Sequence, residues 1–255
     1  MHKNIKKKEL NQEVIKDNLN SNKENKKNIF QKIWYFIWDD DSVLSWVVNI
    51  ILAYVLIKYV IYPGIGLIFG TSFPIVAVVS GSMEHKLSNG FICGKFPENY
   101  QNNFDSFWET CGSYYEKINI NKDQFKKFPF SNGFNTGDIM ILFGKKPETL
   151  KIGDVIVFMG SKYNPKPYPI IHRVVDIKKS NDVSNSLVFH TKGDHNSDSI
   201  NGCERDGCIY EFEISESQLI GKAVFRIPAL GYIKIWFVDF LKLIGLDKTF
   251  GKLFN

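Results

Sequence analysis

Residues 74–84 read Pro-Ile-Val-Ala-Val-Val-Ser-Gly-Ser-Met-Glu, a β-branched apolar run that ends in a polar turn. Proline before such a run and Ser-Gly after it are typical of a short strand bounded by turn residues. Two later stretches, 137–142 and 153–158, each place a Gly-Asp pair directly before an apolar run of the same kind. Three strands with their own turns indicate a mainly β domain.

More strand candidates follow, with the spacing of a compact antiparallel or mixed β domain. They are residues 170–177, 186–191, 209–214 and 219–225. Between residues 88 and 136 the pattern becomes irregular, which predicts an insertion with a short helix near 104–111 rather than a second domain. Its aromatic side chains, including Trp108, Tyr114 and Tyr115, suit either a membrane-facing or partner-facing surface or packing against the β domain.

An apolar stretch at residues 43–62 precedes this domain and is interrupted only by Asn49 and Lys58. Its 20 residues are about the length needed to cross a hydrocarbon core of roughly 30 Å. The lysine-rich segment before it predicts a cytoplasmic N-terminus, a single pass through the cell membrane and an extracytoplasmic domain. A cleaved signal peptide is the alternative, but the charged tail is too long and no small-x-small site follows. We expect Pro63-Gly64 to end the helix, leaving 65–73 as a membrane-proximal strip too short to span alone.

Length and composition limit the class of protein. The 255 residues predict a charged tail at 1–41, an anchor and strip at 42–73, a β domain at 74–231 with its insertion at 88–136, and a C-terminal segment at 232–255. The hydrophobic share of 44% excludes a disordered chain, and the net charge of +5 is not gathered into a basic stripe, so we expect no nucleic-acid partner. Charges at 234, 239 and 242 share one side of a helix, which favours a C-terminal amphipathic helix on the membrane over a second spanning helix.

The four cysteines form two well-separated pairs. An even number of cysteines in an extracytoplasmic domain favours disulfides, which we predict between Cys93 and Cys111 and between Cys203 and Cys208. Zinc binding is the alternative, but the first pair is too widely spaced for a usual zinc ribbon. We therefore expect no metal and no cofactor.

The chain offers the groups that a serine protease needs. Ser82 follows a strand through a glycine, and His172 lies in another predicted strand, where its neutral ring can accept the serine proton. The Ser82 N–H and the Ser80 hydroxyl lie two residues apart and can face a developing oxyanion. Asp194 or Asp198 can hold the other ring nitrogen of His172. Taken singly, each of these groups also has an ordinary explanation as a turn or surface residue.

The combination resembles a known family. Ser-Gly-Ser-Met-Glu (80–84), Gly-Asp-Val-Ile-Val-Phe (153–158), Ile-His-Arg-Val-Val (171–175) and Thr-Lys-Gly-Asp-His-Asn (191–196) look like the conserved boxes of type I signal peptidases, in the same order and after an N-terminal anchor. Bacterial members use a Ser-Lys dyad, whereas the archaeal and endoplasmic-reticulum type carries a histidine at the base position. His172 makes this chain similar to the second type.

The resemblance implies a role for each matching residue. Ser82 is the expected nucleophile, Ser80 an oxyanion contributor and His172 the general base, with Asp198 as the first choice for the orienting carboxylate, Asp194 in support and Asp206 as the fallback. His85 departs from the family, which commonly has proline there, and we interpret His85 and Lys86 as residues at the rim of the site.

The resemblance also implies a substrate and partners. The expected activity is a signal peptidase I, a serine endopeptidase that removes signal peptides from secretory pre-proteins in the plane of the lipid bilayer, with the secretion translocon as a further candidate partner. An extended peptide can add beside the strand at 74–79 and the segment before His172, in shallow apolar pockets. The residues expected to bind it are Val76, Val78, Val79, Met83, Ile170 and Ile171. Two alternatives are a non-catalytic relative that binds signal peptides and a Ser-Lys protease that uses Lys178 or Lys179.

Overall fold

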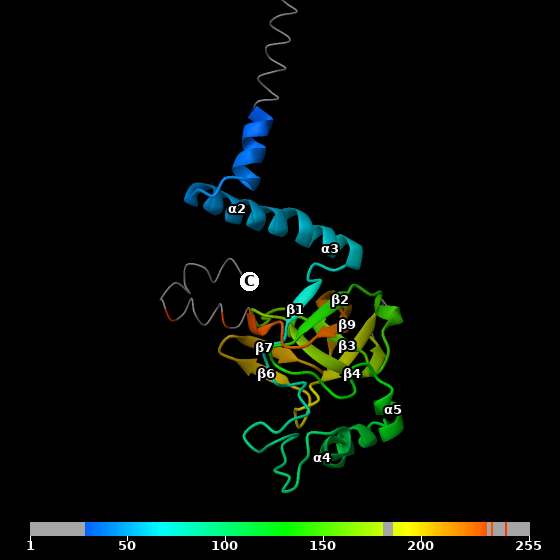
Figure 1. The fold of residues 1–255 in the computed structure, drawn as a ribbon. Helices are drawn as coiled ribbons and strands as arrows, with labels where there is room; N and C mark the ends of the chain where they lie inside the picture. The colour runs from blue at the N-terminus through cyan, green and yellow to red at the C-terminus, as the bar shows by residue number, and fades with distance from the viewer. Residues whose placement is uncertain (1–28, 181–185, 234–235, 237–242, 244–255) are drawn as a thin grey trace, which may run out of the picture. The chain divides into compact units, whose positions relative to one another are not determined.

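The computed structural model describes residues 29–180, 186–233, 236 and 243 (Figure 1). The chain divides into two compact units, one ending at Pro63 and the other beginning at Gly64. Most of the charged tail and of the expected C-terminal amphipathic helix lies outside the described residues. The second unit carries all the predicted site residues.

A long apolar helix begins at Val43 and ends at Phe69, and it is the one helix of the described part that is long and apolar enough to cross a membrane. It comprises α2 (Val43–Leu56), a π-helical turn η1 (Ile57–Ile61) and α3 (Tyr62–Phe69). Ser42 caps its start by accepting a hydrogen bond from the Ser45 N–H. A shorter helix at 29–38 precedes it.

The helix does not end at Pro63-Gly64, so that prediction is wrong. A proline inside an α-helix removes one hydrogen bond and crowds the carbonyl four residues earlier. Here the π-helical turn lies directly before the proline, and the Tyr62 N–H donates to the Ile57 carbonyl, five residues back. The wider turn relieves the crowding, so the helix continues through the proline. The strip expected at 65–73 is therefore helical up to Phe69.

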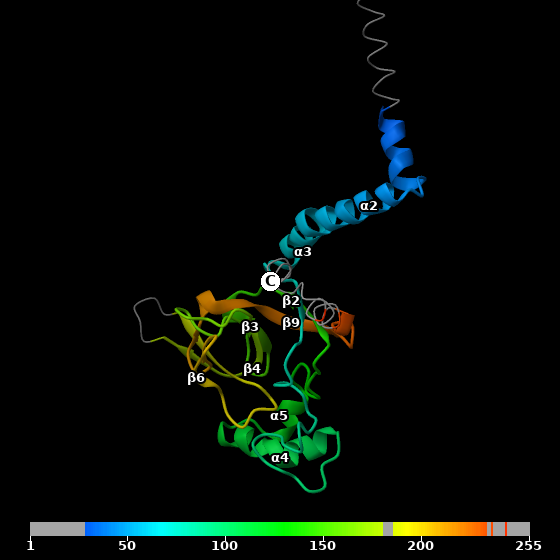
Figure 2. The same cartoon turned by 90° about the vertical axis from the view of Figure 1, so that its left-hand side faces the viewer.

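The second unit is mainly β, as predicted. Its seven-stranded antiparallel sheet has the order β1-β2-β9-β3-β4-β5-β8 and is strongly curled (Figure 2). The strands are β1 (Ile75–Ala77), β2 (Ile139–Phe143), β3 (Val155–Phe158), β4 (Ile170–Lys179), β5 (Leu187–Lys192), β8 (Ile214–Ser215) and β9 (Leu219–Ile227). Short 3-10 turns lie at η2 (Pro147–Thr149) and η3 (Glu216–Gln218).

Strand β3 lies between two hydrophobic clusters of the β unit. All four of its residues are buried, because Val155 and Val157 belong to one hydrophobic cluster while Ile156 and Phe158 belong to another. A strand covered on both faces needs an uninterrupted apolar run, which is what residues 155–158 provide. Ile156 pairs with His172 of β4, so the same strand fixes the position of the histidine.

One predicted strand, 209–214, is divided in the structure. Its first residues belong to β7 (Gly207–Tyr210), which forms a two-stranded hairpin with β6 (Asn201–Glu204), a strand that the sequence pattern did not reveal. Its last residue begins β8, which pairs with β5. Glu211 lies at the break between the two strands.

The insertion packs against the β domain and contains two helices, α4 (Phe104–Lys117) and α5 (Lys122–Lys126). Figures 1 and 2 both show these helices at one end of the sheet. Trp108, Tyr115 and Phe125 of these helices pack in one hydrophobic cluster with Val175 of β4. Of the two alternatives for the aromatic residues, the structure supports packing for Trp108 and Tyr115, which are buried, while Tyr114 is half-buried.

Both predicted cysteine pairs are joined by disulfides in the structure. Cys93–Cys111 connects the first loop of the insertion to α4. Cys203–Cys208 connects directly opposed residues of β6 and β7. The second disulfide therefore holds the hairpin that leads to Glu211.

Candidate active site

Ser82 and His172 form a hydrogen-bonded pair. The Ser82 Oγ lies 2.9 Å from the His172 Nε2, although the two residues are 90 positions apart in the sequence. Ser82 lies in the turn after β1, where the Glu84 N–H donates to the Gly81 carbonyl and the Ser82 carbonyl accepts from the His195 N–H. His172 is 2% exposed and held by β3 and β5 on either side of β4. The pair has the geometry of a nucleophile and its general base.

The carboxylate behind the histidine is Glu211. Its Oε1 lies 2.5 Å from the His172 Nδ1, and its side chain is completely buried. The ionised Glu211 carboxylate accepts a hydrogen bond from the His172 Nδ1–H, which leaves the Nε2 lone pair directed at Ser82. The structure therefore brings together Ser82, His172 and Glu211, and the assignment of this role to Asp198 or Asp194 is wrong.

Three further contacts hold the Glu211 carboxylate in place. Its Oε1 also accepts from the Thr191 hydroxyl at 2.8 Å, and its Oε2 accepts from the Ile200 N–H at 2.6 Å. Burial works against ionisation, but the attraction of the His172 ring when it is protonated and the hydrogen bonds from His172, Ile200 and Thr191 together lower the pKa of Glu211 below its ordinary value. The carboxylate is thus charged at neutral pH and oriented before substrate binds.

No motif in the sequence points to Glu211. In a regular strand over 209–214, Glu211 would share one face with Ile209 and Glu213, and Tyr210 and Phe212 would share the other. The face with the two aromatic residues would be the one expected in the core, and the face with the two glutamates the one expected in solvent. The structure shows Glu211 buried while Tyr210 and Phe212 are exposed. The chain leaves the hairpin here, as the Glu211 N–H donates to the Ile200 carbonyl and its own carbonyl accepts from the Thr191 N–H.

Asp198, the first choice for this role, and Asp206, the fallback, lie elsewhere. Asp198 is exposed, and its carboxylate accepts from the N–H of the adjacent Ser199. Asp206 forms an ion pair with Lys166 at 2.7 Å and accepts from the Tyr168 hydroxyl. Neither carboxylate contacts His172 in the described hydrogen bonds and ion pairs.

Asp194 is completely buried and pairs with Arg173, the residue after His172. The Arg173 Nε and Nη2 donate to its two oxygens at 2.8 and 2.7 Å, and the Tyr115 hydroxyl donates at 2.9 Å. Although burial opposes ionisation, the Arg173 charge and these hydrogen bonds hold the pKa of Asp194 well below its usual range. Asp194 therefore joins β4, the loop after β5 and helix α4 around the site rather than orienting His172.

His85 is not a rim residue, so that interpretation is wrong. Its side chain is buried, its Nε2 lies 3.0 Å from the second oxygen of Asp194, and its ring stacks on Phe107 at 3.5 Å between centroids. Burial lowers the pKa of His85, which indicates a neutral ring that donates to Asp194. Only its neighbour Lys86 is exposed, as a rim residue should be.

Ser80 lies where an oxyanion contributor is expected. Its Oγ is exposed and lies 3.2 Å from the Ser82 Oγ. Among the hydrogen bonds of the described residues, none uses the Ser82 N–H as a donor. Both donors thus remain available to an oxygen bound beside Ser82.

The six residues expected to bind a peptide divide into two groups. Val78 and Met83 belong to the hydrophobic core, and the Met83 sulfur accepts from the Asp194 N–H, so these two are corrected to core residues. Val76, Ile170 and Ile171 are half-buried and Val79 is exposed, so these four can still contact a ligand. Strand β1 pairs only with β2, which leaves its other edge free within the described sheet.

The backbone of Gly193 approaches the Ser82–His172 pair closely. A Cβ atom on Gly193 would lie 2.8 Å from the His172 Nε2 and 2.8 Å from the Ser82 carbonyl oxygen. Contacts that close force one of the neighbours to move. The glycine is therefore required by the geometry of the site itself.

The candidate bases for a Ser-Lys mechanism are not in the site. Lys178 and Lys179 end strand β4 and are exposed, and Lys178 pairs with Asp176 at 3.1 Å. His172, not a lysine, occupies the position beside the Ser82 hydroxyl.

Comparison with known proteins gives one group of relatives, although no protein-family model matches the chain. The chain is 34% identical over 103 residues to the signal peptidase complex catalytic subunit SEC11 of Lachancea thermotolerans, and 31% identical over 104 residues to SEC11 of Zygosaccharomyces rouxii. Each match covers 40% of this chain and 57% of the relative. Human SEC11C is 26% identical over 109 residues, 43% of this chain and 53% of that protein.

The chain thus spans little more than half the length of these relatives. The names of these relatives agree with the family that the four sequence boxes resemble. The chain therefore has its homologues among the catalytic subunits of signal peptidase complexes, which confirms the resemblance that its motifs indicated.

Proposed function

We propose that this chain is a membrane-anchored serine endopeptidase that removes N-terminal signal peptides from secreted and membrane pre-proteins. The observation that carries the proposal is the continuous arrangement of Ser82, His172 and Glu211, with 2.9 Å between the Ser82 Oγ and the His172 Nε2. Three residues from separate parts of the chain meet in the order nucleophile, base and carboxylate. A purely structural role for this polar chain would not need the serine to be accessible, yet Ser82 is half-exposed.

The proposed reaction follows from this geometry. His172 accepts the Ser82 proton as Ser82 attacks the carbonyl carbon of the scissile bond, and Glu211 stabilises the imidazolium that forms. The Ser82 N–H and the Ser80 hydroxyl stabilise the oxyanion. The imidazolium then protonates the leaving amine, and water hydrolyses the acyl-enzyme through the same residues.

The free edge of β1 and the apolar helix support the choice of substrate. An extended peptide can pair with an exposed strand edge through main-chain hydrogen bonds, and β1 leads directly to Ser82. A helix that crosses the bilayer would keep the enzyme in the same plane as the signal helix of its substrate, which raises their effective concentration. We also propose that the chain lies in the cell membrane with its β unit on the extracytoplasmic side. Secretory pre-proteins are its proposed substrates.

Replacing Ser82 with alanine tests the proposal directly. We expect Ser82→Ala to remove cleavage of a model pre-protein, with a loss of at least about 10³-fold in kcat/KM, because Ser82 carries the hydroxyl that His172 contacts. His172→Lys should lose comparable activity, since the β4 position is built for a ring held by Glu211. The measurement is the rate of signal-peptide release by full-length protein in detergent or vesicles. Full activity of Ser82→Ala would leave a binding role as the better explanation.

Replacing Gly193 with alanine should disrupt the same pair without removing any catalytic group. The added methyl group would push His172 and Ser82 apart, and a displacement of about 1 Å can cost on the order of 10² in rate. Gly202→Ala is the matched control, because a Cβ there meets nothing within 4 Å. Equal kcat/KM for the two variants would contradict the close approach of Gly193.

A further inference from the structure

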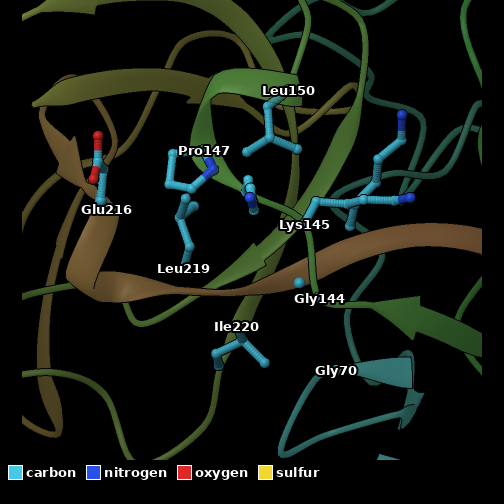
Figure 3. Close-up of a pocket in the computed structure, with 11 residues that line it drawn as sticks. Gly70, Gly144, Lys145, Pro147, Leu150, Glu216, Leu219 and Ile220 are labelled. Atoms are coloured by element: carbon cyan, nitrogen blue, oxygen red, sulfur yellow. The ribbon is translucent and has the colours of Figure 1, made fainter. Parts of the chain in front are cut away.

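A cavity of about 370 Å³ lies in the β unit, next to the end of the apolar helix and apart from Ser82 and His172. Figure 3 shows Pro147, Leu150, Leu219 and Ile220 around it, with Lys145 at one side and Glu216 at the other. One wall is therefore apolar while the sides carry charge. None of the residues that line it belongs to the candidate active site.

The charges around the cavity do not balance. Three lysines line the cavity, and one of them, Lys222, pairs with Asp154 at 2.6 Å. The lining also contains Glu216, whose carboxylate accepts a hydrogen bond from the Leu187 N–H at 2.7 Å. Lys145 and Lys146 are exposed and have no carboxylate partner among the ion pairs of the described residues. Two adjacent positive charges are thus left for a ligand that carries negative charge.

The backbone fixes these lysines beside the residue at which the apolar helix ends. The Gly144 N–H donates to the Phe69 carbonyl at 2.8 Å, and the Phe69 and Phe143 rings stack at 4.4 Å. A Cβ on Gly144 would lie 1.8 Å from the Gly70 carbonyl oxygen, so only glycine permits this approach. If the helix crosses a bilayer, Phe69 lies at its boundary, and Lys145 and Lys146 lie at the depth of the lipid headgroups.

We propose that this cavity binds the headgroup of an anionic membrane phospholipid. Lys145 and Lys146 would contact the phosphate, and the apolar wall would contact the glycerol and the first acyl carbons. A free phosphate would use the lysines but gain nothing from Leu150, Leu219 and Ile220. The proposal rests on the membrane-spanning helix and not on the protease activity.

Lipid binding can be measured without reference to cleavage. Full-length protein in non-ionic detergent is titrated with short-chain phosphatidylglycerol, and the bound fraction is read by native mass spectrometry, with phosphatidylcholine as the neutral lipid and inorganic phosphate as the competitor. The test variant is Lys145→Gln combined with Lys146→Gln. Its matched control is Lys126→Gln combined with Lys127→Gln, an exposed adjacent lysine pair at the end of α5 that makes the same charge change.

We expect phosphatidylglycerol to bind more tightly than phosphatidylcholine, and the test variant to weaken its binding roughly 30-fold, about fivefold for each lysine. The control variant should bind like the unmodified protein. Equal binding by the test and control variants, or equal binding of the two lipids, would overturn the site. Displacement of the lipid by equimolar inorganic phosphate would overturn the lipid as its ligand.

Discussion

Replacing Glu211 with glutamine is expected to lower kcat/KM for signal-peptide cleavage by roughly 10³-fold to 10⁴-fold. The glutamine keeps the size of the side chain but cannot stabilise an imidazolium, and its amide can donate to the Nδ1 and favour the wrong tautomer of His172. The loss should fall on kcat rather than KM, because Glu211 is completely buried and contacts His172, Thr191 and Ile200 rather than substrate. Steady-state kinetics on the full-length protein measures this.

Two further variants sharpen that experiment. Glu211→Asp retains the charge but withdraws the carboxylate by one methylene, so we expect an intermediate loss on the order of 10-fold to 100-fold. Asp198→Asn is the matched control, because Asp198 is an exposed carboxylate that contacts the Ser199 N–H. An inactive Asp198→Asn together with an active Glu211→Gln would restore the assignment that the sequence favoured.

Replacing Asp194 with asparagine is expected to destabilise the β unit by about 3–5 kcal/mol, because it leaves the Arg173 guanidinium buried without its counter-charge. Arg173 is completely buried, and its remaining partners are the carbonyls of Pro129, Gly153 and Phe130. A loss of that size corresponds to a melting temperature lower by roughly 6–20 °C for a unit of this length. Thermal unfolding of the full-length protein in detergent, followed by near-UV circular dichroism, measures it. Asp198→Asn should change the melting temperature little.

The same comparison has an expected pH dependence. The pKa of Asp194 is depressed in the folded protein, so its stabilising contribution is fully present above the unfolded value of 3.8 and is lost as the pH falls below that value toward the folded pKa. The difference in melting temperature between the unmodified protein and Asp194→Asn should therefore stay constant from neutral pH down to about pH 5. A difference that disappears between pH 7 and pH 5 would contradict the lowered pKa, because it would require Asp194 to titrate well above its ordinary value.

Much of the fold could be predicted because its signals are local. The apolar runs of β1, β2 and β3 carry their own turn residues, and the apolar helix is continuous in the sequence. The exceptions are equally physical: Pro63 is accommodated by a π-helical turn that no periodicity indicates, and β6 is a short, wholly exposed strand with no apolar pattern. His85 was misjudged because its partners, Asp194 and Phe107, come from other parts of the chain.

The sequence by itself determined the class of this protein: a membrane helix followed by a β domain with a serine and a histidine in ordered motifs, each recognisable within a few residues. Only the tertiary structure decided which carboxylate stands behind His172 and which one holds Arg173. Asp194 lies in the expected motif but pairs with the buried guanidinium of Arg173. Glu211, which follows a disulfide-bonded hairpin in the chain, contacts His172. That choice depends on where separate segments meet in space, and the charge of a residue type cannot reveal it.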